Sequence, residues 1–347
     1  MAASLLRKKS GIFNPLLTRF LNSPPGRRRS FGTLAFDEIR VSTERPYDHT
    51  ALIVHGLLGS ARNWRSFSRN LLSTIPNPSA WRAVLVDLRN HGRSAEIEGF
   101  DPPHDLTNAA KDLANLVESQ GWAWPDVVIG HSMGGKVALQ YVESCARGDY
   151  GESALLPKQM NQNSKVHVCN CDSSGNSLNE QLWVLDSFLG VKEPEDEEEV
   201  ENVLRTLRSV PPTVPSRKWL VNHLLGLGFS KSLSEWIGSN LKKSGDHMTW
   251  AFNLDGAAEM LKSYREKSYW PLLEHPPKGM EIDIVRAEES DRWDPATIQR
   301  LESLATLERG PSEGNVTAHL LPKSGHWVHV DNPKGLLEIM APKIDAI

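Results

Sequence analysis

The chain has 347 residues, enough for one large α/β domain with an insertion or for two small domains. Its formal net charge is −4, and no run approaches the about 18 apolar residues that a membrane-spanning helix needs. These values exclude a transmembrane segment and predict a soluble or at most peripheral protein, and its acidic body excludes a nucleic-acid-binding function.

The first segment, residues 1–35, is basic. It contains seven arginines and lysines, including the run Arg27–Arg29, and no acid. An Arg-rich, acid-free leader is typical of an organelle transit peptide, so we expect a mitochondrial protein, with the plastid as the alternative. The other interpretation is a disordered basic arm that binds an anionic surface.

Short apolar runs recur along the rest of the chain, as in strands of a parallel sheet that is buried on both faces. Amphipathic stretches at 105–120 and 133–144 lie between them, so the pattern predicts a doubly wound α/β sheet. The predicted strands are Phe36–Ser42, Thr50–Gly56, Arg82–Asp87, Asp126–Gly130, Leu182–Asp186, Glu281–Arg286 and Val316–Leu321.

Two segments interrupt this alternation. Residues 160–181 are polar and rich in Ser and Asn. This composition predicts a surface loop that is inserted into the first part of the core domain. Residues 187–277 carry no strand pattern and are predicted to form a helical cap. The first part of the core is then 36–186 and the second part 278–347. The helices expected in the cap are 200–209, 216–227, 233–243 and 255–268.

The cysteines are Cys145, Cys169 and Cys171. An odd number without framework spacing argues against a disulfide scaffold. The pair Cys169-Asn170-Cys171 lacks the further ligands that a zinc site needs. The sequence therefore predicts neither a metal nor an organic cofactor.

Ser132 is the predicted nucleophile. It stands in Gly130-His131-Ser132-Met133-Gly134, which follows an apolar strand and opens an amphipathic helix. That context is the one a nucleophile elbow requires, since the glycines relieve crowding in a sharp strand-to-helix turn. The bare pattern is weak, because about one chain in ten of this length matches it by accident.

A second glycine-rich turn, His55-Gly56-Leu57-Leu58-Gly59, follows an earlier strand. There the backbone N–H groups of Leu57 and Met133 can form an oxyanion hole, which stabilises a developing alkoxide. The alternative is a tight turn without chemistry. The nearby loop Asp87–Ser94 is predicted to brace the site, so His91 is given a structural role.

His326 is the predicted general base, because it follows the last strand and imidazole titrates near neutrality. The order of serine, acid and histidine along the chain is the one this fold requires. His329 is the alternative. Three residues are candidates for the acid of the triad: Asp186, Asp291 and Asp255. Each of them could instead have a purely structural role, such as helix N-capping.

Together these residues resemble the α/β-hydrolases, and within them the group of alpha/beta-hydrolase domain-containing protein 11 and its bacterial esterase relatives. The resemblance spans about 36–345 and implies an α/β-hydrolase fold with a helical cap inserted after the sixth strand of the family. The matching segments are His55–Ser60, Asp87–Ser94, Gly130–Lys136, Trp183–Ser187, Trp250–Asp255 and Gly325–Pro333.

The resemblance also bears on the acid. In this group the acid after the sixth strand can complete the triad, which favours Asp186. Asp291 stands at the position that most other members of the fold use, and the family motif matching Asp255 has also been taken as the acid. The long separation of Ser132 and Asp186 in this chain is explained by the insertion 160–181.

The sequence thus predicts a serine hydrolase that cleaves a carboxylic ester, including lipid acyl esters or thioesters, through an acyl-enzyme. The alternatives are an acyltransferase and a non-catalytic protein that keeps the fold to bind a ligand or a mitochondrial partner. A monomer or weak dimer is expected. The substrate cannot be named, because fold does not fix function.

Overall fold

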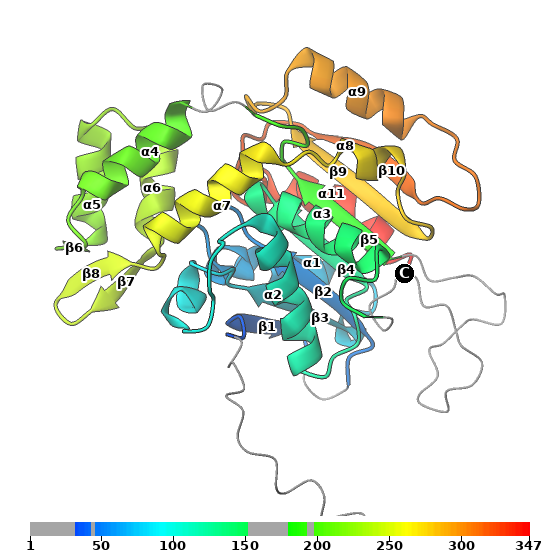
Figure 1. The fold of residues 1–347 in the computed structure, drawn as a ribbon, viewed down its shortest axis with the longest axis horizontal. Coiled ribbons are helices and arrows are strands. Elements are labelled where there is room, and N and C mark those ends of the chain that lie inside the picture. The colour runs from blue at the N-terminus through cyan, green and yellow to red at the C-terminus, as the bar shows by residue number, and fades with distance from the viewer. Residues whose placement is uncertain (1–31, 43–45, 152–179, 193–197) are drawn as a thin grey trace, which may run out of the picture. The chain divides into compact units, whose positions relative to one another are not determined.

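A seven-stranded sheet lies at the centre of the computed structural model, which describes residues 32–42, 46–151, 180–192 and 198–347 (Figure 1). Its strands are β1 Phe36–Arg40, β2 His49–Val54, β3 Trp81–Val86, β4 Val127–His131, β5 Glu180–Leu185, β9 Met280–Ala287 and β10 Asn315–Leu321. They lie in the order β1-β3-β2-β4-β5-β9-β10. Only the pairing of β1 with β3 is antiparallel among them. The mostly parallel, doubly wound sheet predicted from the sequence is confirmed.

The central strands are apolar because both of their faces are covered. Along β2, Leu52 and Val54 pack into the core cluster that contains residues of α2 and α3. Ala51 and Ile53, which alternate with them, pack into the cluster that contains residues of α1 and α11. A continuous apolar run is therefore what this position in the sheet requires.

Eleven helices are assigned in the described part of the chain, together with three short 3-10 turns at 61–64, 78–80 and 92–96. Several begin at side-chain caps: Asp105, for example, accepts a hydrogen bond from Asn108 N at the start of α2. The helices are α1 Arg65–Thr74, α2 Leu106–Ser119, α3 Met133–Ala146, α4 Glu198–Ser209, α5 Arg217–Gly226, α6 Lys231–Ser239, α7 Leu254–Glu266, α8 Trp270–Glu274, α9 Pro295–Ala305, α10 Val328–Asp331 and α11 Pro333–Ile344.

The cap, which follows β5, holds α4 to α7 and also a small antiparallel sheet that the sequence analysis did not predict. Its strands are β6 Thr213–Val214, β7 Leu241–Ser244 and β8 His247–Trp250, in the order β6-β8-β7. The helix expected over 233–243 instead ends at Ser239. The chain then reverses at Gly245, whose φ of 57° is easy for glycine, and Leu241 pairs with Trp250.

The expected leader and most of the expected insertion lie outside the described residues. The compact unit begins at Gly32, slightly before the boundary expected at 35. Leu34 is buried in the core, and Ala35 N donates to Ser94 Oγ over 2.9 Å. Glu180 and Gln181, expected in the insertion, instead begin β5, because they pair with Met280 and Glu281.

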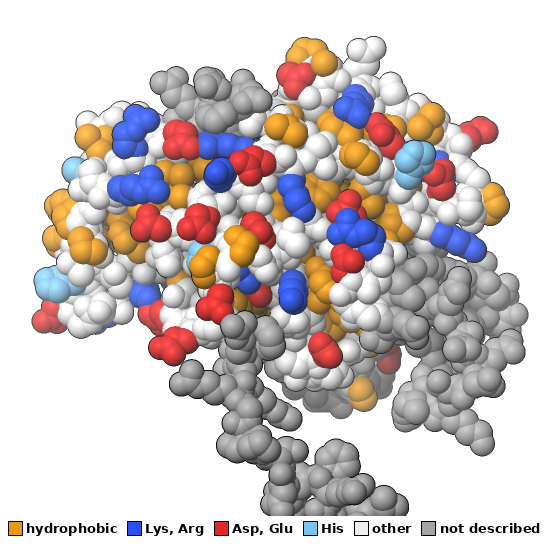
Figure 2. Space-filling view, in the orientation of Figure 1, with side chains coloured by type: hydrophobic (Ala, Val, Ile, Leu, Met, Phe, Trp, Pro, Cys, Tyr) orange, Lys and Arg blue, Asp and Glu red, His pale blue; other side chains and the backbone are white. Residues whose placement is uncertain are grey.

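Among the described residues, no helix combines the length and the apolar composition of a membrane-spanning segment. On the face drawn in Figure 2, cationic and anionic side chains are interspersed over the described core and cap.

Candidate active site

Ser132 lies at a sharp turn between β4 and α3. Its φ of 54° and ψ of −124° are strained for a residue with a side chain, and Ser132 N donates to Leu185 O over 3.0 Å. A Cβ on Gly130 would lie 2.3 Å from Gly134 O, and one on Gly134 would lie 2.4 Å from His55 O. The two glycines are therefore required by close backbone contacts, which explains the spacing of the motif.

His326 and Asp186 are joined by a hydrogen bond. His326 follows β10 and Asp186 directly follows β5, and the distance from His326 Nδ1 to Asp186 Oδ2 is 2.7 Å. Because a carboxylate only accepts, Nδ1 carries the hydrogen in this bond. The other ring nitrogen, Nε2, is then left as an acceptor, which is the state that a general base needs.

Three further donors hold the Asp186 carboxylate, which is completely buried. They are Trp293 Nε1 at 2.7 Å, Ser290 Oγ at 2.8 Å and Ala287 N at 3.1 Å. Burial alone would raise the pKa of Asp186, but the hydrogen bonds from His326, Trp293 and Ala287 and the charge of His326 lower it below its ordinary value. Asp186 is therefore ionised at neutral pH.

The pKa of His326 is lowered, first by burial and then by the positive charge of Arg292, while Asp186 opposes both. Arg292 Nε lies 2.9 Å from His326 Nδ1 and 4.0 Å from Asp186 Oδ2. Since Nδ1 holds one hydrogen, it cannot donate to Asp186 and accept from Arg292 at the same time. The imidazole is neutral at pH 7 and can take up a proton.

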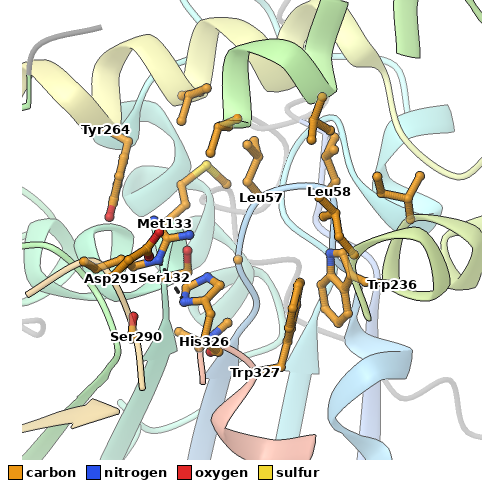
Figure 3. Close-up of a pocket in the computed structure, with 18 of the residues that line it drawn as sticks. Leu57, Leu58, Ser132, Met133, Trp236, Tyr264, Ser290, Asp291, His326 and Trp327 are labelled. Atoms are coloured by element: carbon orange, nitrogen blue, oxygen red, sulfur yellow. Dashed lines mark hydrogen bonds between the residues drawn. The ribbon is translucent and has the colours of Figure 1, made fainter. Parts of the chain in front are cut away.

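Ser132 and His326 line one pocket of about 380 Å³, where they lie next to each other (Figure 3). One wall is polar and is formed by Glu289, Ser290, Asp291 and Arg292. The apolar wall comes largely from the cap. Its residues include Val200, Val203, Leu233, Trp236, Ile237, Leu261 and Tyr264.

Leu57 and Met133, the two residues expected to supply the oxyanion hole, line the same pocket. The turn that follows β2 and carries Leu57 is held by His91, whose Nε2 accepts a hydrogen bond of 3.0 Å from Leu58 N. His91 Nδ1 donates to Arg89 O over 2.9 Å. Leu58 has a φ of 55°, so this turn depends on a side-chain partner to stay in place.

His91, in the loop after β3, binds the loop after β2, and His55, directly after β2, binds the loop after β3 in return. His55 Nδ1 donates to Gly56 O over 2.8 Å, and its Nε2 accepts from Leu88 N over 3.1 Å. Burial lowers the pKa of both histidines, that of His91 to about 3, so both rings are neutral. The two neutral rings cross-link the loops that follow β2 and β3, which agrees with the bracing role predicted for Asp87–Ser94.

Among the described residues, neither of the two alternative acids is a hydrogen-bond partner of the His326 ring. Asp291 is exposed at the polar wall of the pocket, and His326 Nδ1 bonds to Asp186 rather than to it. Asp255 lies in the first turn of α7, where its side chain is 86% exposed and pairs with Arg208 at 3.6 Å. It is not among the described residues that line the pocket.

His329, the alternative base, is buried and stacks on Trp64, with 4.0 Å between the ring centroids. Burial lowers its pKa to about 3. His131 makes a contact that the sequence does not predict: its Nε2 donates to His326 O over 2.7 Å and fixes the loop of that histidine. The contacts of Ser290 and Trp293 with Asp186 likewise have no local signal in the sequence, because they depend on how this loop lies against β5.

The model of the alpha/beta hydrolase family matches residues 51–339, which is most of the chain. The chain belongs to this family. The resemblance inferred from its motifs is confirmed, and a solved structure, a marine microorganism esterase, shares the fold. Its TM-score is 0.64 at 20% identity, covering 90% of this chain and 99% of that one.

This α/β hydrolase is also similar to three proteins whose names describe enzymes that cleave or form esters. It is 23% identical over 293 residues to the sn-1-specific diacylglycerol lipase ABHD11 of Mus musculus, covering 83% of this chain and 78% of that one. It is 24% identical over 368 residues to protein phosphatase methylesterase 1 of Homo sapiens, covering 91% and 86%. A shorter match of 116 residues, at 33% identity, is to a probable alcohol acetyltransferase of Saccharomyces cerevisiae, covering 33% and 31%.

Proposed function

We propose that this α/β hydrolase is a carboxylic ester hydrolase in which Ser132, His326 and Asp186 form the catalytic triad. The observation that carries the proposal is the bond of 2.7 Å between His326 and the buried Asp186, beside a serine held in a strained turn at the same pocket. The names of the lipase and the methylesterase that resemble the chain support the same reaction class.

The proposed reaction proceeds through an acyl-enzyme. His326 Nε2 removes the proton from Ser132 Oγ as Oγ bonds to the ester carbonyl carbon, and Asp186 stabilises the resulting imidazolium. The N–H groups of Leu57 and Met133 bind the oxyanion, each worth about 3 kcal/mol in the transition state. His326 then protonates the leaving alcohol as its C–O bond breaks, and later activates the water that releases the acid.

The two walls of the pocket suggest how the substrate lies. The apolar wall under the cap fits an acyl chain, and the polar wall at Asp291 and Arg292 fits the alcohol part of the ester. A lipid ester of moderate chain length suits this division, and a thioester with the same acyl chain is an alternative substrate.

The test is a series of p-nitrophenyl esters from acetate to decanoate, together with monoacyl and diacyl glycerols. We expect activity to rise with chain length and then to fall once the chain exceeds the pocket. Ser132→Ala should abolish hydrolysis of every ester. Equal rates for the wild type and Ser132→Ala would contradict the proposal.

The similarity to a probable alcohol acetyltransferase raises a second candidate, because only the acceptor distinguishes acyl transfer to an alcohol from hydrolysis. Adding ethanol to the ester assay separates the two. An acyltransferase forms the ethyl ester at the expense of free acid at low ethanol concentrations. A hydrolase releases mainly acid.

We also propose that residues 1–35 direct the protein to the mitochondrion, on the composition of that segment alone. Fusion of residues 1–35 to a fluorescent protein tests this. Import with removal of the segment supports targeting, and uniform cytosolic fluorescence contradicts it.

A further inference from the structure

Lys136 is a buried cation that the proposed reaction does not use. It lies one turn after Ser132 on α3 and is completely buried. Its Nζ donates hydrogen bonds of 2.6 Å to the backbone carbonyls of Gly190, Tyr264 and Lys267. An ammonium has three hydrogens, so each of them is used in one of these bonds.

The three carbonyls belong to the two connections between the core and the cap. Gly190 lies where the chain leaves β5 for the cap, and Tyr264 and Lys267 lie where α7 ends and the chain returns to the core. The last carbonyls of a helix lack partners within it and carry the negative end of its dipole. The ammonium of Lys136 satisfies such groups at the end of α7 and the outgoing connection together.

Other bonds at this point join the same two connections. Lys192 N donates to Arg265 O over 3.0 Å, and Tyr269 N donates to Leu189 O over 2.9 Å. Gln140, one turn after Lys136 on α3, accepts a bond of 3.0 Å from Tyr269 Oη. The entry and exit of the cap are thus fastened to each other and to the helix that follows Ser132.

Tyr264 connects these bonds with the pocket. Its backbone carbonyl accepts a hydrogen bond from Lys136, and the centroid of its ring lies 4.5 Å from Lys136 Nζ. The same ring lines the pocket (Figure 3). Tyr264 Oη also accepts a hydrogen bond of 3.2 Å from Phe188 N in the outgoing connection. Met133, on the same helix as Lys136, lines the pocket from the core side.

We infer that Lys136 is a positioning residue that fixes the cap over Ser132 and so sets the length of acyl chain that the pocket accepts. The selectivity part of this inference rests on the proposed ester hydrolysis. Without Lys136 the buried carbonyls of Gly190 and Tyr264 and the half-buried carbonyl of Lys267 lose this partner, so α7 is held less firmly against α3. A shift of the apolar wall weakens binding of long chains more than attack on short ones, because a short acyl group barely contacts the cap.

The test measures hydrolysis of p-nitrophenyl octanoate and p-nitrophenyl acetate by the wild type and by two variants. Lys136→Met removes all the donors of the side chain, and Lys136→Gln keeps two of them. We expect the ratio of kcat/KM for octanoate to that for acetate to fall about tenfold in Lys136→Met, mainly through KM, and less in Lys136→Gln. Fluorophosphonate labelling of Ser132 should persist in both.

Lys343→Met is the matched control. Lys343 Nζ also binds two acceptors, the buried Asp283 Oδ1 and the half-buried Thr317 Oγ1, but it does so from α11 and away from the cap. This control should lower the melting temperature and leave the octanoate-to-acetate ratio within about twofold of the wild type. If the Lys136 variants behave in the same way, with lower stability and an unchanged ratio, the inference is wrong.

Hydrogen exchange separates this inference from the proposed function, because it needs no activity. Faster amide exchange in residues 187–192 and 264–270 is expected in the Lys136 variants and not in Lys343→Met. If no ester is hydrolysed but this exchange pattern appears, the proposed function fails and the anchoring role stands. Unchanged exchange in both connections overturns the anchoring role itself.

Discussion

His326 donates its Nδ1 hydrogen to Asp186 across 2.7 Å, although the two residues are 140 positions apart in the chain. Two adjoining features of the fold produce this contact: β5 and β9 are neighbours in the sheet, and β9 is paired with β10, which His326 follows. The Asp186 backbone is fixed as well, since its N–H donates to Val285 O over 2.8 Å.

The first prediction concerns the acid. Asp186→Asn should lower kcat by about 10³- to 10⁴-fold, because an amide that donates to Nδ1 favours the tautomer that cannot accept the serine proton. Asp291→Asn and Asp255→Asn are the matched controls and should change kcat by less than about threefold. Steady-state kinetics on one soluble ester decides between them, and a collapse in Asp291→Asn alone would assign the acid to that residue.

The second prediction concerns the pH dependence of activity. The base must be neutral, and the lowered pKa of His326 places the acid limb of kcat/KM below the ordinary histidine value of 6.5. Arg292→Met removes a nearby positive charge, so the pKa of His326 rises and the acid limb moves to higher pH. Arg300→Met, which removes an exposed arginine paired with Glu274, is the control and should leave the limb in place. A limb that stays fixed in Arg292→Met would refute the role of this charge.

The third prediction concerns the turn that presents Leu57. His91→Leu removes the acceptor of Leu58 N, and we expect kcat to fall roughly 10- to 100-fold with a smaller change in KM, since the oxyanion donors are misplaced. His223→Leu, on the cap, serves as the control. Loss of stability in His91→Leu without loss of kcat would show that the ring supports only the fold.

The fourth prediction concerns stability in acid. The pKa values of His91 and His329 are about 3 in the folded protein, against 6.5 for an ordinary histidine. Between these values the unfolded chain binds protons that the folded chain does not, so stability falls as the pH drops from about 6.5 towards 3. Each group contributes a slope of about 1.4 kcal/mol per pH unit. Urea unfolding at several pH values should show a shallower slope in His329→Phe, and an identical slope would rule this out.

Local patterns predicted much of the fold and part of the site. Apolar runs located the seven strands of the main sheet, because a strand covered on both faces has little choice of residues. The spacing of Gly130, Ser132 and Gly134 reflects contacts within one turn, so it can be read without tertiary information. The structural role of His91 followed from His326, whose place after the last strand makes it the better candidate for the base.

The partner acid could not be read in this way. Asp186, Asp291 and Asp255 all occupy plausible local positions, and what distinguishes them is their distance from His326, which only the assembled sheet determines. Lys136 and Gln140 illustrate the same limit. Their spacing gives α3 an amphipathic pattern, yet both are completely buried, because the cap connections cover that side of the helix.

The small sheet of the cap was missed because its strands are short and only partly buried. Lys242, Lys243 and Ser244 give β7 no alternating apolar pattern. The turn at Gly245 was the one local signal, and it is weak without two apolar strands beside it.

The proposed function depends above all on the activation of Ser132 by His326. The most direct measurement is peptide mass spectrometry of the protein after treatment with a fluorophosphonate. We predict one adduct, on the peptide that contains Ser132, and its absence in Ser132→Ala, with much slower formation in His326→Ala. No adduct on the folded wild type, or an adduct on another residue that persists in Ser132→Ala, would contradict this account.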